Sequence, residues 1–262
     1  MKGGWPVKTL FVKDFRQLWR TFRLPALLLL GIFFAILDPI GAKYMPQIME
    51  KLMSGTEGIT IVMPEMGPVD AMASFFGDLA QIGAFILIVI AMGAVANERE
   101  RGISAWVLTR PVGRQPYFWS KFAAYTAGVL LTVSASTLLA ALYTASLMGA
   151  PPVGPTIWGA VFMVLYLELI LAITLGASAL LRGQIAAGGA AFAFLILLWL
   201  PQLLVDQTEL GKYMPYRLSS LIAELLKGSA VPADFLPALA AAFIVAAAVL
   251  AAASFYFSRA EL

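Results

Sequence analysis

The feature that most constrains this chain is a series of long apolar stretches separated by short charged segments. Six stretches are long enough to cross a hydrocarbon core about 30 Å thick as helices. They cover roughly 24–41, 71–96, 122–148, 157–181, 185–205 and 236–257. Charged residues make up only 13% of the 262 residues, about half the share typical of a soluble domain. We therefore expect an all-α integral membrane protein, a single domain over 1–262, with six transmembrane helices.

The distribution of basic residues predicts the orientation of these helices. Six spans put both termini on one side, and that side would carry 13 of the 18 Lys and Arg residues. The remaining 5 lie in two segments on the opposite side, 43–70 and 206–235. Because cytoplasmic loops carry the excess of basic residues, we expect a multi-pass protein of the cytoplasmic membrane with both termini in the cytoplasm. The loop at 97–121 would then be cytoplasmic, and 43–70 and 206–235 extracytoplasmic.

Residues 1–23 carry charge throughout, which argues against a signal peptide. They instead predict an amphipathic helix over Leu10–Arg23. One face of this helix is apolar and holds Phe11, Phe15, Leu18, Trp19 and Phe22; the other is basic and holds Lys13, Arg16, Arg20 and Arg23. This pattern is typical of an elbow helix lying in the membrane interface beside anionic lipid. The alternative is a helix packed on a soluble core, which four basic residues on one face disfavour.

The two extracytoplasmic segments each predict a further helix. In 43–70, Met45, Met49 and Met53 recur at a spacing of four residues. Such a thioether ladder could bind copper(I), but an apolar face resting on the bilayer or the bundle is the favoured interpretation. In 206–235, an apolar helical face ends at Gly228, a residue type that often terminates helices. That helix would lie on the surface or enter the membrane part of the way.

Two acids inside predicted spans stand out as candidates for function. Glu168 is near the middle of the fourth span, where an ionised acid costs roughly 2.5 kcal/mol or more. Asp78 lies nearer the outer end of the second span, and Gln81 follows about one turn further in. These residues either line a translocation path or carry protons, or they form hydrogen bonds between helices. The packing interpretation is favoured for Asp78, and neither is favoured for Glu168.

The loop at 97–121 is the densest charge cluster between apolar stretches, with five basic residues. Inside it, Ile103–Leu108 predicts a short helix that ends at Pro111, because proline cannot donate the next helical hydrogen bond. The loop resembles that of the type-2 ABC transporter permeases, which has an acidic-basic pair, an acid and a glycine, an apolar turn, Pro-x-x-Arg and a lysine. The residues at these places are Glu98, Glu100, Gly102, Leu108, Pro111, Arg114 and Lys121.

This resemblance implies a coupling helix that docks into a cleft of a separate ATPase subunit. The coupling residues would be Glu98, Glu100, Arg101, Gly102, Ile103, Trp106, Leu108, Pro111 and Arg114. Trp106 would be the buried anchor, with Glu98, Glu100 and Arg101 as orienting charges at the rim. The family also implies a permease dimer with two ATPase copies, with ATP and Mg²⁺ bound by the ATPase. The alternative is a solvated cytoplasmic turn that only obeys the charge rule.

Missing residue types exclude several activities. The chain has no Cys and no His, so disulfides, thiolate chemistry, imidazole metal sites and a Ser-His-Asp triad are excluded. There is no phosphate-binding Gly-rich motif: the Gly211-Lys212 pair has Asp206 where the first glycine would stand. Together with the resemblance, these absences imply a transport subunit and not an enzyme, with no cofactor of its own and membrane lipid instead of nucleic acid as a partner. The alternatives are a proton-coupled secondary transporter using Glu168 and an intramembrane enzyme using both acids.

Overall fold

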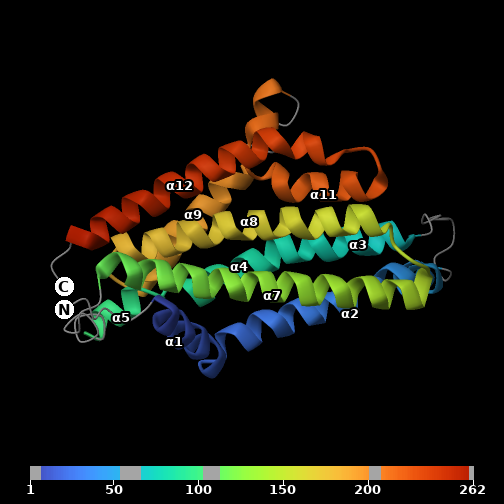
Figure 1. Ribbon diagram of the computed structural model, residues 1–262. Helices are drawn as coiled ribbons and strands as arrows, with labels where there is room; N and C mark the ends of the chain where they lie inside the picture. Colours follow the sequence, from blue (N-terminus) through green and yellow to red (C-terminus); the bar gives the residue numbers. More distant parts are fainter. Residues whose placement is uncertain (1–6, 54–65, 103–112, 201–207, 260–262) are drawn as a thin grey trace.

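The computed structural model describes residues 7–53, 66–102, 113–200 and 208–259, and within these ranges the chain is helical with no strand (Figure 1). An N-terminal helix, α1 (Val7–Arg20), precedes a long helix, α2 (Arg23–Met53). The next stretch combines α3 (Pro68–Asp78), the π-helix η1 (Leu79–Gly83), α4 (Ala84–Ala91) and the short α5 (Ala96–Glu100). After it come α7 (Arg114–Met148), α8 (Val153–Leu180), α9 (Gln184–Trp199), α11 (Arg217–Lys227) and α12 (Leu236–Arg259). Short 3-10 turns cover Glu209–Tyr213 and Pro232–Phe235.

Five of the helical stretches are long and apolar enough to cross a membrane: Arg23–Ile48, Pro68–Glu100, Arg114–Met148, Val153–Leu180 and Pro232–Arg259. They agree with five of the six predicted spans. The remaining prediction, 185–205, falls on α9, whose 16 residues reach only about 24 Å. Residues 201–205 of that prediction lie outside the described residues. Within the part of the chain that the structure describes there are thus five candidate spans, and the sixth stays a prediction.

The long helices run side by side as a bundle, with α7 packed between α2 and α8, and α12 covering α8 (Figure 1). The α8–α12 contact is close: a Cβ added at Gly176 would lie 2.4 Å from Val249 Cγ1. Small residues on α8 and in the Ala-rich α12 therefore bring the two backbones together, as expected for helices packed in a membrane. The short α5, the start of α7 and the C-terminal end of α12 lie at the same end of the bundle (Figure 1).

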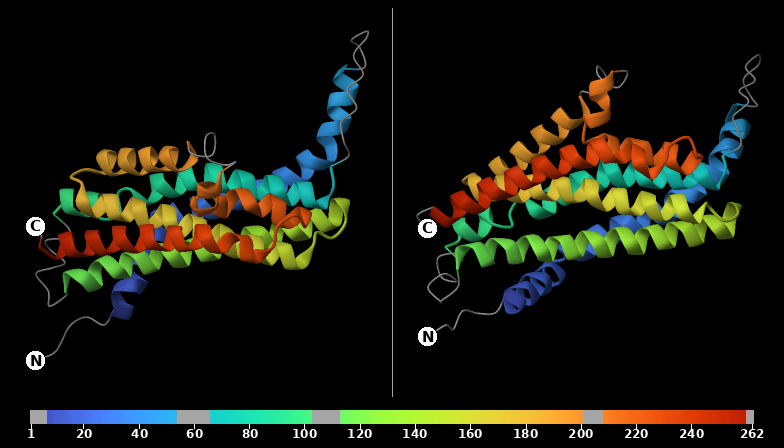
Figure 2. Two further views of the ribbon diagram at one scale, coloured as in Figure 1. Left: turned by 90° about the horizontal axis from the view of Figure 1, so that it is seen from above. Right: turned by 45° about the horizontal axis from the view of Figure 1, so that its top comes forward.

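The predicted outer segments differ in part from the structure. The first span does not stop near residue 41, because α2 continues to Met53 through Pro39 and Pro46. Figure 2 shows its C-terminal part turning away from the bundle, and prolines inside a helix cause such bends. The second predicted outer helix is present as α11 and ends at Gly228, whose φ is +77°. Its apolar face is buried against α3 and α8, so the helix packs on the bundle.

The helices also extend into the predicted loop at 97–121. On one side α5 reaches Glu100, and on the other α7 begins at Arg114, eight residues before the predicted start of the third span. The early start is possible because buried neighbours, instead of lipid, surround Tyr117, Phe118 and Lys121. The predicted short helix at 103–108 and Pro111 lie outside the described residues.

Candidate functional site

The N-terminal side of the 97–121 loop is fixed to the end of α8. The backbone N–H groups of Val95 and Ala96 donate to Ser178 Oγ, at 3.1 and 3.0 Å. The Arg99 guanidinium donates to the carbonyl oxygens of Ala179, at 3.2 Å, and Leu181. The last carbonyls of a helix have no partner within the helix, so a guanidinium placed there both satisfies them and opposes the helix dipole. These bonds tie α5 to α8.

The C-terminal side of the loop is fixed to the end of α12 in a similar way. Arg114 is the first residue of α7, and its Nη1 donates to the carbonyl oxygen of Ser258 at 3.2 Å. One turn further on, the Tyr117 ring stacks on Phe257 with ring centroids 5.8 Å apart. The start of α7 is therefore fixed to the C-terminal turn of α12.

Between these two anchors lies a buried charge cluster, which we define as Asp14 of α1, Glu98 of α5 and Tyr117 and Lys121 of α7. Lys121 Nζ is 2.8 Å from Glu98 Oε1 and 3.4 Å from Asp14 Oδ1. The side chains of Lys121, Asp14 and Glu98 are only 4%, 3% and 9% exposed. Tyr117 donates its hydroxyl hydrogen to Glu98 Oε2, and Lys121 Nζ lies 5.0 Å from the centre of its ring.

Further side chains complete the hydrogen bonding of the two acids. Ser120 Oγ donates to Asp14 Oδ2 at 2.8 Å, and Gln17 Nε2 donates to Glu98 Oε1 at 3.2 Å. Lys13, at the edge of the cluster, lies 2.9 Å from Asp14 Oδ1. Two acids thus face two lysines, and all four carboxylate oxygens have partners.

Such an arrangement fixes geometry more than it adds stability. Taking charges out of water costs several kcal/mol per ion, and an ion pair recovers this only when its remaining hydrogen bonds are made. The cluster meets that condition, so its net contribution is small, but removal of one partner would leave an uncompensated buried charge. It therefore holds α1, α5 and α7 in one relative position.

The predicted translocation residues lie in three different surroundings. Glu168 of α8 accepts a hydrogen bond from Thr126 Oγ1 of α7 at 2.8 Å, while its Oε1 is buried without a partner. Asp78 interacts with Asp38, a buried acid of α2 that sequence analysis did not single out. Gln81, on the π-helix, lines a cavity of about 460 Å³ between η1, α9 and α11. The structure does not unite these residues into one site.

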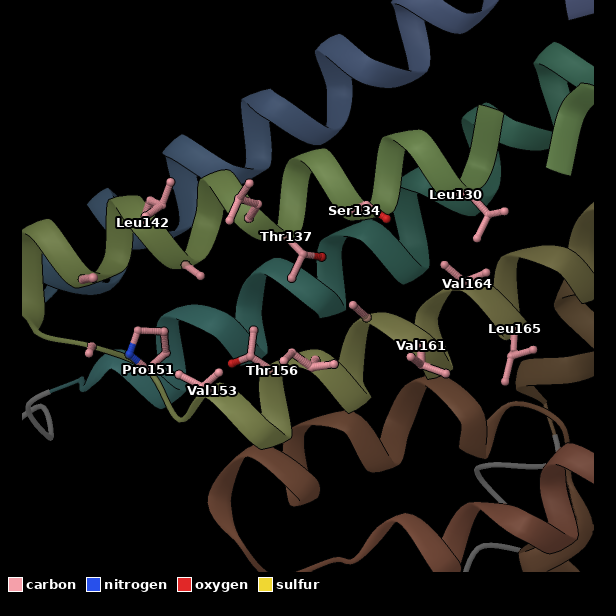
Figure 3. Close-up of a pocket in the computed structure, with 16 residues that line it drawn as sticks. Leu130, Ser134, Thr137, Leu142, Pro151, Val153, Thr156, Val161, Val164 and Leu165 are labelled. Atoms are coloured by element: carbon pink, nitrogen blue, oxygen red, sulfur yellow. The ribbon is translucent and has the colours of Figure 1, made fainter. Parts of the chain in front are cut away.

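A larger groove of about 700 Å³ runs between α7 and α8. Figure 3 shows Leu130 and Thr137 of α7 facing Val164 of α8 across it. Its lining is almost entirely apolar. None of the three predicted path residues lines the groove. Glu168 lies one turn after the lining residue Val164 on α8, and Thr126 lies one turn before the lining residue Leu130 on α7.

A comparison with protein families matches residues 9–262 to the ABC-2 family transporter proteins. The chain belongs to this family. It is therefore a multi-pass membrane protein and a permease subunit of an ABC transporter, as the resemblance at 97–121 implied. The permease is also 26% identical over 134 residues to the uncharacterized transmembrane protein YxlG of Bacillus subtilis (strain 168). That alignment covers 51% of the permease and 52% of YxlG, so the permease spans about half the length of this curated relative.

The predicted coupling residues of the permease separate into two groups. Glu100, Arg101 and Gly102 are exposed, and Gly102 has φ +66°, which a glycine adopts without strain. Glu98 differs from the expected rim position, because it is buried in the charge cluster and paired with residues of its own chain. Arg114 likewise bonds to α12. Ile103, Trp106, Leu108 and Pro111 lie outside the described residues, and their role stays a prediction.

Sequence analysis missed Asp14, Tyr117 and Gln17 as members of this site. A signal for Asp14 was present: it lies between Leu10 and Leu18 at a spacing of four, on the side of α1 that packs on α7. An acid in the middle of a leucine face needs a buried cation as its partner. Lys121, the lysine of the family pattern, is that cation. Tyr117 carried no comparable signal, because aromatic residues are common near membrane interfaces.

Proposed function

We propose that this permease is the membrane subunit of an ATP-driven exporter and that a separate ATPase subunit drives it through the 97–121 loop. Two permease copies and two ATPase copies would form the transporter, with ATP and Mg²⁺ bound by the ATPase. The observation that supports this proposal is the fixed base of the loop. Its flanking helices α5 and α7 are joined to α1, α8 and α12 by the charge cluster, Arg99 and Arg114.

This base gives a physical route for coupling. When ATP closes the two ATPase subunits, each would displace the loop that it grips. Because α5 and α7 are bonded to three further helices at that end, a displacement of the loop moves all five helix ends together. A rigid-body movement of this kind can open a path at the interface between the two permease copies.

The proposal places the charge cluster at the cytoplasmic side, with α1 as an elbow helix in the membrane interface. The charge distribution supports this orientation. Because the chain has no cysteine, single cysteines can be introduced at Ser104 and at Ser229, an exposed residue just after α11. An impermeant maleimide added to intact cells is expected to label Cys at 229 and not at 104. Labelling of 104 alone would show the orientation to be reversed.

Coupling is tested by Trp106→Ala, because a large buried aromatic residue usually dominates such an interface. The variant is expected to insert and fold normally but to recover roughly tenfold less ATPase subunit in purification, with coupled ATP hydrolysis reduced in parallel. Trp158→Ala is the matched control. Trp158 is half-exposed on α8, near the end of the helix away from α5, and its loss should leave recovery unchanged.

A second variant covers the case in which one side chain is not enough. Trp106→Ala combined with Gly102→Pro removes both the anchor and the left-handed turn, since proline is restricted to negative φ. Normal ATPase recovery and normal stimulated hydrolysis in this double variant would overturn the coupling assignment.

A proton-coupled secondary transporter is the second candidate, and the buried Glu168 with its unpartnered Oε1 is the observation that favours it. A carrier of that kind needs no ATPase, so Trp106→Ala would leave its transport intact while Glu168→Gln would abolish it. The two candidates therefore predict opposite results for transport by the Trp106→Ala variant.

A further inference from the structure

One face of α1 forms the wall of a hollow of about 440 Å³ at its outer side. The residues that line it share one helical face: Thr9, Val12, Lys13, Arg16, Gln17, Arg20 and Thr21. Three of them are cations, and two carry hydroxyl groups. Neither acid of α1 or α5 in the charge cluster lines the hollow, so its lining is positive.

The two arginines of this hollow have no bonding partner among the described residues. Arg16 and Arg20 are exposed, and neither makes a hydrogen bond or an ion pair with any residue that the structure describes. Each guanidinium presents five N–H donors in a planar fork that matches the oxygens of a phosphate. Because Arg16 and Arg20 are four residues apart on a helix, both can reach one phosphate group.

The hollow is also connected to the charge cluster through two of its lining residues. Lys13 lies 2.9 Å from Asp14 Oδ1, and Gln17 donates to Glu98 Oε1 at 3.2 Å. Asp14 and Glu98 are the two acids that hold Lys121. An anion bound in the hollow would therefore act on the residues that fix the base of the 97–121 loop.

The neighbouring surface of α1 indicates which anion is bound. Next to the basic face, Trp19 and Phe22 are 54% and 62% exposed, and Val12 inside the hollow is 44% exposed. Exposed aromatic and aliphatic residues beside a basic face suit a molecule with an anionic head and apolar chains, whereas a free phosphate would gain nothing from them.

We propose that Lys13, Arg16 and Arg20 form a binding site for the phosphate of an anionic phospholipid, and that the bound headgroup stabilises the charge cluster. Because an ammonium group has three donors, Lys13 can contact the phosphate and keep its ion pair with Asp14 Oδ1. The bound headgroup would then hold Lys13, and α1 with it, against the acids that pair with Lys121. The site would make coupling depend on the anionic lipid of the leaflet. This inference rests on the orientation in the proposed function, but its first test needs only the purified permease.

The test is native mass spectrometry of the detergent-purified permease titrated with phosphatidylglycerol, with phosphatidylcholine as the neutral comparison. Wild type is expected to retain phosphatidylglycerol preferentially. Arg16→Gln combined with Arg20→Gln should weaken that binding by roughly 10- to 30-fold, because each basic group near an anionic headgroup contributes about 1 kcal/mol. An unchanged thermal midpoint of the variant shows that the fold is retained.

The matched control removes two charges of the same sign outside the hollow. Lys8→Gln combined with Arg182→Gln changes exposed residues, one of them on α1 itself, and neither lines the hollow. Its phosphatidylglycerol binding should stay within about twofold of wild type. An equal loss in both double variants would overturn the site, because net charge alone would then explain binding. Displacement of phosphatidylglycerol by millimolar inorganic phosphate would also overturn the lipid assignment.

The effect on the cluster has its own readout. Phosphatidylglycerol is expected to slow amide hydrogen exchange in α5 and in the first turns of α7 in wild type, but not in the Arg16→Gln, Arg20→Gln variant. Lipid binding without any change in exchange there would overturn the connection to the cluster. If ATPase recovery proves independent of Trp106 while lipid binding behaves as expected, the coupling proposal fails and the lipid site stands.

Discussion

The permease buries acidic residues in two kinds of surroundings, and the two are built differently. In the charge cluster at the base of the 97–121 loop, all four oxygens of Asp14 and Glu98 have partners. Deeper in the bundle, Asp38 Oδ2 and Glu168 Oε1 are buried without a hydrogen-bond partner among the described residues. The first arrangement has one favourable geometry. The second leaves carboxyl oxygens that can accept a hydrogen bond from a group that moves toward them.

The difference follows from what surrounds each acid. Glu98 and Asp14 meet at the junction of three helices, where two lysines, a tyrosine, a serine and a glutamine can reach them. Among the described residues, Glu168 has one hydrogen-bond partner, Thr126, between two largely apolar helices. A fully bonded cluster suits the transmission of force, whereas an incompletely bonded acid suits a step in which contacts change.

The largest expected effect comes from breaking the cluster. Lys121→Met leaves Asp14 and Glu98 facing each other with one lysine at the edge, and loss of one partner of a buried ion pair costs about 3–5 kcal/mol of folding free energy. A large drop in the thermal midpoint of the detergent-purified permease measures it. Lys212→Met is the control, because the Lys212–Glu209 pair is exposed and contributes about 1 kcal/mol or less.

A compensated variant sharpens this result. Lys121→Met together with Asp14→Asn and Glu98→Gln removes the uncompensated charges, so most of the lost stability should return. Recovery of the midpoint without recovery of coupled ATP hydrolysis would show that the cluster serves coupling. If Lys121→Met alone were as stable as Lys212→Met, the cluster would not be paired in the folded protein.

A smaller effect is expected at Glu168. Glu168→Gln keeps an oxygen that accepts from Thr126, and Glu168→Leu removes it, so Gln should preserve assembly better than Leu. Hydrogen bonds between membrane helices contribute about 0.6 kcal/mol on average, so the difference in unfolding free energy should stay below about 1 kcal/mol. Thr126→Val, which removes the other partner, should match Glu168→Leu in stability.

A transport assay shows whether Glu168 has a role in translocation, which the stability measurement does not show. A permease that folds with Glu168→Gln but no longer transports needs the carboxyl group for translocation. Transport equal to wild type in both Glu168 variants would remove this residue from the path. Glu168 would then differ from the acids of the charge cluster only in how it packs.

The sequence predicted most of the helices because lipid imposes a simple rule: a span must be long and apolar. For five spans, most of the ends predicted by that rule lie within a few residues of the ends in the structure. It failed at the start of α7, where residues 114–121 are helical although polar, because α1, α5 and α12 satisfy their side chains. Hydropathy reports what faces lipid, and it does not report what faces another helix.

The candidate site was predicted only in part, for a related reason. The family pattern identified Glu98, Arg114 and Lys121 but gave no information on their partners. Those partners, Asp14 on α1 and Ser258 on α12, are 107 and 144 residues away from Lys121 and Arg114 along the chain. Contacts over such separations depend on how the helices pack, which a single sequence does not encode in any local pattern.

The π-helix Leu79–Gly83 determines how the later residues of the second span are rotated about the helix axis. The buried positions Phe76, Ala80, Ala84 and Ile88 recur every four residues, which a regular helix of 3.6 residues per turn would not keep on one side. The wider turn absorbs this excess. Deleting one residue from it would rotate α5 by about 100° relative to α3. Glu98 would then point away from Lys121, so a single backbone irregularity deep in the bundle determines whether the charge cluster can form.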